Sequence, residues 1–247
     1  MSYARLTYAT GGTYGGLALG GLLGGQTTGT VSATAYPLLG NVGVTVTWSG
    51  PPYVRLSRVV AGVRTPVRGA YPLPLPAGVF TDGDAPLDVA ITYEATAPGQ
   101  AFVAVSSPVT LAGQGGTWLS HPTLGPALRV IVTREPGAER AIQRGVHRIL
   151  GRVYPVAVSA DQRESATGTL QVMVETFAQR DALWALLDDG QPLLLRSPPT
   201  LGHGVGEWLS IGDVALAALG HGAWEAPRIL SLPYQVVDTP ASNLDEL

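Results

Sequence analysis

Apolar and polar residues alternate in short segments along the middle of the chain. Residues 42–48 read Val-Gly-Val-Thr-Val-Thr-Trp, with the period of two that a half-buried β-strand requires. Further short apolar segments follow, separated by turns that contain Gly or Pro, at 53–60, 87–95, 101–105 and 108–111. About seven short strands within 39–113 predict a small antiparallel β-sandwich.

A second group of strands occupies 127–240 and surrounds one predicted helix. Thr176 is a suitable N-cap, Gln179 completes a capping box, and Gly190 ends the periodic segment, which predicts a helix near 177–189. Apolar strand segments precede and follow the helix, at 127–132, 152–158, 166–175, 191–196, 207–218 and 224–238. The order predicts a β-barrel or sandwich with a single helix laid across it, so the expected fold class is mainly β.

Three segments remain outside these two domains. Residues 1–38 are rich in Gly, Thr and Tyr and are expected to form an N-terminal arm that becomes ordered against a neighbour. Residues 114–126 show little periodicity and are interpreted as a linker, and 241–247 form a C-terminal tail. The arm could equally be a flexible leader.

The composition favours a protein that associates with partners over a monomer. Only 13% of the 247 residues are charged, whereas 45% are hydrophobic, and ordinary domains carry roughly 25% charged residues. A surface with few charges is best explained by burial against partners. The net charge of −3 argues against a protein that binds nucleic acid by neutralising phosphates.

The residue types present exclude several kinds of chemistry. All fifteen basic residues are arginine and cysteine is absent, which removes lysine-dependent catalysis, thiol nucleophiles and thiolate metal sites. His203, Glu207, Asp213 and His221 could suggest a metal site, but the glycines between them favour a loop. Asp82 and Asp84 are interpreted as turn residues. We therefore expect no catalytic residue, no cofactor and no metal, and a protein that is not an enzyme.

Two resemblances follow from these patterns. Residues 39–113 resemble a fibronectin type III domain, with Trp48 and Tyr93 where that family places core aromatics. Residues 127–240 resemble the tail-tube module of siphophage tail proteins. The segments that carry the second resemblance are 151–158, 168–170, the capped helix, 191–198, 211–214 and 232–240. Together the two halves resemble minor tail proteins of phages that infect high-GC actinobacteria, akin to distal tail proteins.

The resemblance implies a structural component of the virion tail tip or baseplate. Such a protein would form a threefold or sixfold ring of its own copies, and it would link the tail tube to host-facing tip proteins, with tube, hub and tape-measure proteins as partners. A ring would also cover the free strand edges expected of the second domain. Four arginines are candidates for contacts between subunits or for the lumen: Arg140, Arg144, Arg148 and Arg152. Ordinary solvated arginines are the alternative.

The runner-up function is a receptor- or carbohydrate-binding adhesion module of the tail, which would contact host surface glycans. Exposed aromatic residues on one face of the sandwich would favour it. The apolar segment 16–25 is about half the length of a membrane span. We therefore expect no membrane span, and synthesis in the cytoplasm of the bacterial host.

Overall fold

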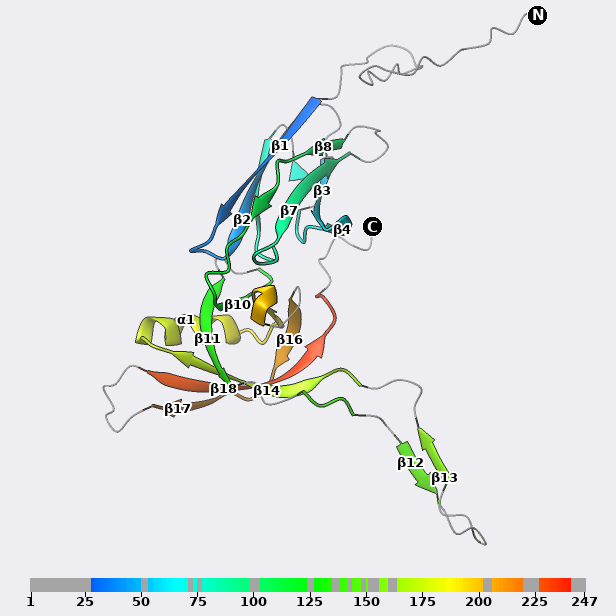
Figure 1. The fold of residues 1–247 in the computed structure, drawn as a ribbon, viewed down its shortest axis with the longest axis vertical. Helices are drawn as coiled ribbons and strands as arrows, with labels where there is room; N and C mark the ends of the chain where they lie inside the picture. Colours follow the sequence, from blue (N-terminus) through cyan, green and yellow to red (C-terminus); the bar gives the residue numbers. More distant parts are fainter. Residues whose placement is uncertain are drawn as a thin grey trace, which may run out of the picture.

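The computed structural model describes residues 28–49, 53–70, 73–74, 77–97, 103–123, 127–134, 138–141, 144–147, 150, 156–159, 164–201, 206–219 and 227–240. They form a mainly β protein with one α-helix, in which a two-sheet sandwich adjoins a β-barrel (Figure 1). The predicted fold class is therefore confirmed. No helix within the described ranges has the length and hydrophobicity needed to cross a bilayer.

The sandwich consists of two antiparallel sheets. One sheet has the order β1-β2-β6 and the other has the order β4-β3-β7-β8, with β5 added to β3 and β9 added to β7. The strands are β1 (Thr28–Tyr36), β2 (Asn41–Ser49), β3 (Tyr53–Val60), β4 (Val63–Pro66), β5 (Leu73–Pro74), β6 (Ala77–Asp82), β7 (Ala90–Thr96), β8 (Val103–Val105) and β9 (Val109–Thr110).

The predicted period of two is visible in the core of the sandwich. In β2, the apolar positions from Val42 to Trp48 are at most 2% exposed, while the threonines between them face outward. In β7, Ile91, Tyr93 and Ala95 are completely buried. Trp48 and Tyr93 thus both lie in the core, because the alternating pattern turns them towards the opposite sheet.

The second half is a barrel of antiparallel strands. Its order is β14-β11-β10-β15-β16-β18, and β18 also pairs with β14, which closes the ring; β17 extends the sheet on β18. The strands are β10 (Thr117–Ser120), β11 (Leu128–Arg134), β14 (Thr167–Val174), β15 (Leu193–Arg196), β16 (Glu207–Ile211), β17 (Ala215–Ala218) and β18 (Arg228–Val237).

Closure of the barrel corrects the expectation of free strand edges for the six strands of the ring, whereas β17 is paired on one side, with β18, among the described residues. β14 and β18 pair from Thr167↔Gln235 to Val174↔Arg228, which is the longest pairing in the barrel. Each of the six strands in the ring therefore has a neighbour on both sides, and the main-chain donors that an open sheet would expose are bonded along these pairings. The pairing of β14 with β18 is non-local, so no pattern within either strand predicted it.

The helix α1 (Phe177–Leu187) has the ends that the sequence predicted. The Thr176 hydroxyl accepts from the Gln179 backbone N–H at 3.1 Å, and the Gln179 side chain accepts from the Thr176 backbone N–H. Gly190 has a φ of +68° and donates to Leu187 O at 3.1 Å. Leu183 is completely buried in the barrel core. The capping box is confirmed, and the helix covers the barrel through its leucine face. A 3-10 turn, η1 (Pro199–Leu201), follows β15.

An extension leaves the barrel between β11 and β14. It ends in a two-stranded hairpin of β12 (Arg144–His147) and β13 (Val156–Ser159), which form a sheet of their own. At its base, the backbones of Glu139 and Thr167 exchange hydrogen bonds of 2.8 and 2.9 Å. Figure 1 shows the hairpin standing away from both the barrel and the sandwich.

Two predicted boundaries differ from the structure. Residues 28–36 of the predicted arm form β1, which pairs with β2 along its whole length, while 1–27 lie outside the described residues. The predicted linker contains β10, which pairs with β11 and β15. Both segments lack strong apolar alternation, and their partners in the sheets determine their conformation. The predicted tail, 241–247, also lies outside the described residues.

Candidate functional site: the joint between sandwich and barrel

The sandwich and the barrel meet at a joint to which the barrel contributes Trp118 from β10. Trp118 is 2% exposed and packs in the hydrophobic cluster of the sandwich. Its indole N–H donates to Gly113 O at 3.1 Å. The ring lies so close to Gly40 that a Cβ there would come 2.6 Å from Trp118 Cε3, and Gly40 also has a φ of +62°. The core of the sandwich therefore includes a side chain from the barrel.

Arg196, at the end of β15, crosses the same joint and is completely buried. One terminal nitrogen donates to Ala85 O at 2.6 Å, and the other donates to Gly40 O and to Ser120 Oγ, both at 2.7 Å. Two of these acceptors belong to the sandwich and one to the barrel. Burial lowers the pKa of Arg196 to about 10, against the opposing effect of nearby Asp82 and Asp84. The guanidinium remains charged at neutral pH and ties the two halves together.

Asp82, at the end of β6, is the acidic centre of the sandwich side. Both of its carboxylate oxygens accept hydrogen bonds from Arg58 Nη1, at 2.9 and 2.8 Å. One of the two oxygens also accepts a hydrogen bond from the Tyr93 hydroxyl at 2.9 Å. Burial raises the pKa of the Tyr93 phenol, and the adjacent Asp82 carboxylate raises it further. Burial acts to lower the pKa of Arg58, but Asp82, together with Tyr93 and Asp84, more than offsets this effect and raises it. Tyr93 is therefore a neutral donor and Arg58 a permanent cation.

A second pair lies beside it at the surface of the joint. Arg68 holds Asp84 through two hydrogen bonds, of 3.0 Å from Nε and 2.6 Å from Nη2. The Arg68 guanidinium carbon lies 4.4 Å from the ring centre of Trp208 in β16, within the range of a cation–π contact. Arg68 thus connects a sandwich turn to a barrel strand through charge and stacking.

A third contact ties β10 to the end of the helix. His121 Nε2 lies 2.8 Å from Asp189 Oδ2, and His121 Nδ1 accepts from the Thr123 backbone N–H at 3.1 Å. This arrangement makes Nε2 the donor to Asp189. The Gln191 backbone N–H and His121 together lower the pKa of Asp189. Asp189 is itself exposed, and its partner His121 is buried.

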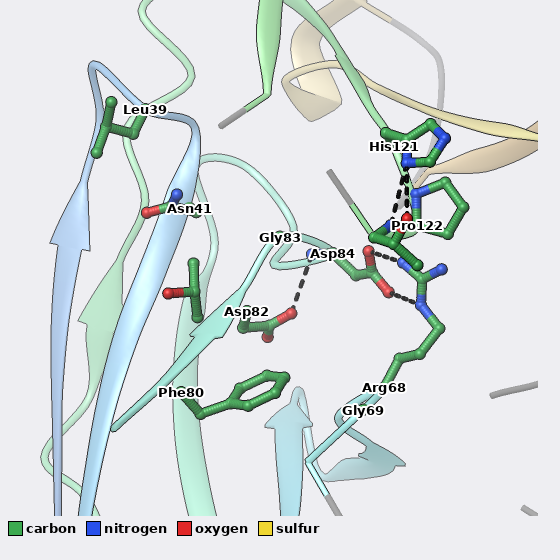
Figure 2. A pocket seen from close by; sticks show the side chains of 12 residues that line it. Leu39, Asn41, Arg68, Gly69, Phe80, Asp82, Gly83, Asp84, His121 and Pro122 are labelled. Carbon is green, nitrogen blue, oxygen red and sulfur yellow. Dashed lines mark hydrogen bonds and ion pairs between the residues drawn. The ribbon is translucent and has the colours of Figure 1, made fainter. Parts of the chain in front are cut away.

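Two cavities open on the joint, on either side of the Arg68–Asp84 pair. The first has a volume of about 670 Å³ and contains Asn41, Asp82 and His121 in its wall (Figure 2). The second, of about 590 Å³, lies between β4 of the sandwich and β16 of the barrel and is lined mainly by apolar side chains. Both volumes fall within the range of ligand-binding sites in proteins.

The carboxylates of the joint are engaged in structural contacts. Asp82 is bonded to Arg58, Tyr93 and the Asp84 backbone N–H, and Asp84 is bonded to Arg68. Asp82 is the last residue of β6 and Asp84 lies in the turn that follows it, which agrees with the turn that the sequence predicted here. Within the described ranges, no three His, Asp or Glu side chains are grouped in a way that could hold a metal ion.

Of the four arginines proposed from the sequence, the two that the structure describes, Arg140 and Arg144, lie away from the joint. Arg140 is exposed at the base of the extension, and Arg144 begins β12, on the hairpin that stands away from the joint in Figure 1. Arg148 and Arg152 lie outside the described residues, as do His203 and His221.

Sequence reasoning missed the arginines that do form the joint: Arg58, Arg68 and Arg196. One signal was available, because Arg196 ends a strand in which every other residue is a leucine, and a charge in a buried strand requires a specific partner. The partners themselves are 76 to 156 residues away in the chain, so the sequence alone could not identify them.

No protein-family model matches the chain, and its sequence matches no curated protein.

Proposed function

We propose that this chain is a structural subunit of a bacteriophage tail tip that assembles into a ring of identical copies and joins the tail tube to the host-facing tip proteins. The observation that carries this proposal is the hairpin β12–β13. Two strands alone bury too little surface to be stable in water and need a third strand or a packing partner. The hairpin stands off the rest of its own chain (Figure 1), so a neighbouring copy is its natural partner.

The joint supports the same proposal. A subunit that positions neighbours in a ring must transmit load without bending between its halves. Arg196 and Trp118 cross the joint with their side chains buried, and Arg68 stacks on Trp208 beside them. The low content of charged residues is consistent with extensive surfaces buried between subunits.

Adhesion to host glycans has less support. Sugar-binding surfaces present flat aromatic rings to solvent. In the described part of the sandwich, Trp48 and Tyr93 are buried, and Tyr36 is the aromatic side chain that is most exposed, at 47%. The residues of the sandwich serve its core and the joint, so assembly remains the function that we propose.

Deletion of the hairpin tests the assembly proposal. We expect native mass spectrometry of the full chain to show one closed oligomer, of three or six copies, and electron microscopy to show a ring. Replacing residues 142–161 by a short Gly-Ser linker should leave a folded monomer, because the barrel closes without the hairpin. Circular dichroism would verify the fold.

A matched variant with the pair Arg144→Ala and Arg148→Ala tests the predicted role of the arginines in assembly. It retains the hairpin backbone and removes two charges. A full chain that stays monomeric at concentrations of about 100 µM, or a deletion variant that still forms the ring, would contradict the proposal.

A further inference from the structure

The apolar groove between β4 and β16 has the chemistry of a peptide-binding site. Its walls consist largely of apolar side chains from the sandwich and the barrel, including the indole of Trp208. The aliphatic and proline side chains are Val60, Val63, Pro66, Pro86, Leu194 and Pro240. Two guanidinium groups, those of Arg58 and Arg68, are set among them. Val63 is 67% exposed at the mouth of the groove. A large apolar surface with a few fixed polar groups is typical of recognition sites.

In both guanidinium groups, some N–H donors are not used by the adjacent aspartate. Arg58 uses only Nη1 to bind Asp82, and Arg68 uses Nε and Nη2 to bind Asp84. Arg68 Nη1 is buried and has no acceptor among the described residues. An unbonded charged donor is costly, and a carboxylate is the acceptor that matches a guanidinium best. The one carboxylate in the described groove wall, Asp84, already has both oxygens bonded to Arg68, so it leaves the remaining guanidinium donors without an acceptor.

The charges behind the groove also favour an anionic ligand. Arg58, Arg68 and Arg196 are opposed by Asp82 and Asp84, so these five side chains carry one more positive charge than negative. The hydrogen bonds of Arg196 go to neutral oxygens. Arg196 lies directly behind the groove, since a Cβ added at Gly206 in the groove wall would lie 3.4 Å from Arg196 Cγ. An anion bound in the groove would balance this buried charge.

We propose that this groove binds an extended segment of a partner protein in which an Asp or Glu is flanked by apolar residues. The carboxylate would accept from the free nitrogens of Arg58, close to the charge of Arg68, and the apolar neighbours would pack against Val63, Leu194 and Trp208. The segment would contact the sandwich and the barrel at once, so it would recognise the assembled joint. The proposal does not depend on ring formation by the chain.

A displayed library of random heptapeptides, selected on the full-length chain, tests this proposal. We expect the enriched peptides to contain one acidic residue between apolar residues. A fluorescein-labelled copy of an enriched peptide should lose about tenfold or more in affinity, measured by fluorescence polarisation, when its Glu or Asp is changed to Gln or Asn.

The variant Val63→Glu places a negative charge at the mouth of the groove and should weaken the acidic peptide by about tenfold or more. Val79→Glu is the matched control, because Val79 is an exposed valine on β6, at 80%, and is not part of the groove. Equal thermal melting of both variants would show that the fold is intact.

Three results would overturn the proposal. They are the absence of enriched peptides, enrichment of basic peptides, and equal binding of the acidic peptide to the Val63→Glu and Val79→Glu variants. Ring formation is measured separately by native mass spectrometry, so failure of the groove and failure of the assembly proposal are distinguishable.

Discussion

Arg196 shows how one side chain can determine the relation between two halves of a protein. Burying an arginine is costly unless its donors find acceptors. Here three acceptors from two domains converge on it at 2.6 to 2.7 Å. Arg196 Nε is the exception, since it is buried and has no partner among the described residues. The geometry is therefore specific to the docked arrangement.

Replacing Arg196 by methionine should destabilise the protein by about 2–4 kcal/mol. Methionine fills most of the volume, but Gly40 O, Ala85 O and Ser120 Oγ would remain buried without a donor, and each unsatisfied group costs about 1–3 kcal/mol before relaxation. Urea unfolding followed by circular dichroism measures the change. Arg134→Met, on an exposed arginine of β11, is the control. A loss below about 1 kcal/mol for Arg196→Met would show that the joint tolerates its removal.

The elements with the strongest local signals are β2, β7 and α1. In β2 and β7, alternation alone places one face in the core, whichever strands are neighbours. In α1, Thr176 and Gln179 satisfy backbone donors within the first turn. β10, in contrast, is four residues long and buried at every position, and its conformation depends on β11 and β15.

Thr176→Ala should reduce the free energy of unfolding by about 1 kcal/mol, because the backbone N–H of Gln179 loses its acceptor at the helix N-terminus. Thr176→Asp retains an acceptor at the same position and should restore most of the loss. Thermal or urea unfolding of the two variants side by side provides the measurement. Equal stability of Ala and Asp at this position would mean that the cap contributes little.

As a whole, the molecule is two β domains that share one joint. Trp118 belongs to a barrel strand but packs in the sandwich core, and Arg196 bonds to both domains. Ala127, ahead of β11, donates its backbone N–H to Leu39 O in the sandwich at 3.1 Å. Neither domain can separate from the other without exposing an indole ring and an arginine that is buried in the intact protein.

The two domains should therefore unfold in a single cooperative transition. Differential scanning calorimetry of the full chain at low concentration should give one peak, with a calorimetric enthalpy equal to the van't Hoff enthalpy. Arg196→Met should broaden or split the peak, because it weakens the coupling between domains. Two well-separated transitions in the unmodified chain would contradict this view of the joint.

The sequence by itself determined the features that depend on local chemistry: the class of fold, the alternating strands of the sandwich, the capped helix from Thr176 to Gly190, and the turn that begins after Asp82 and contains Asp84. Periodicity and capping act within a few residues, so they can be seen in a single chain segment. The tertiary structure alone decided which strands pair, how the barrel closes, and where the arginines find acceptors. These features join residues far apart in the chain, and their free energy exists only once both partners are in place.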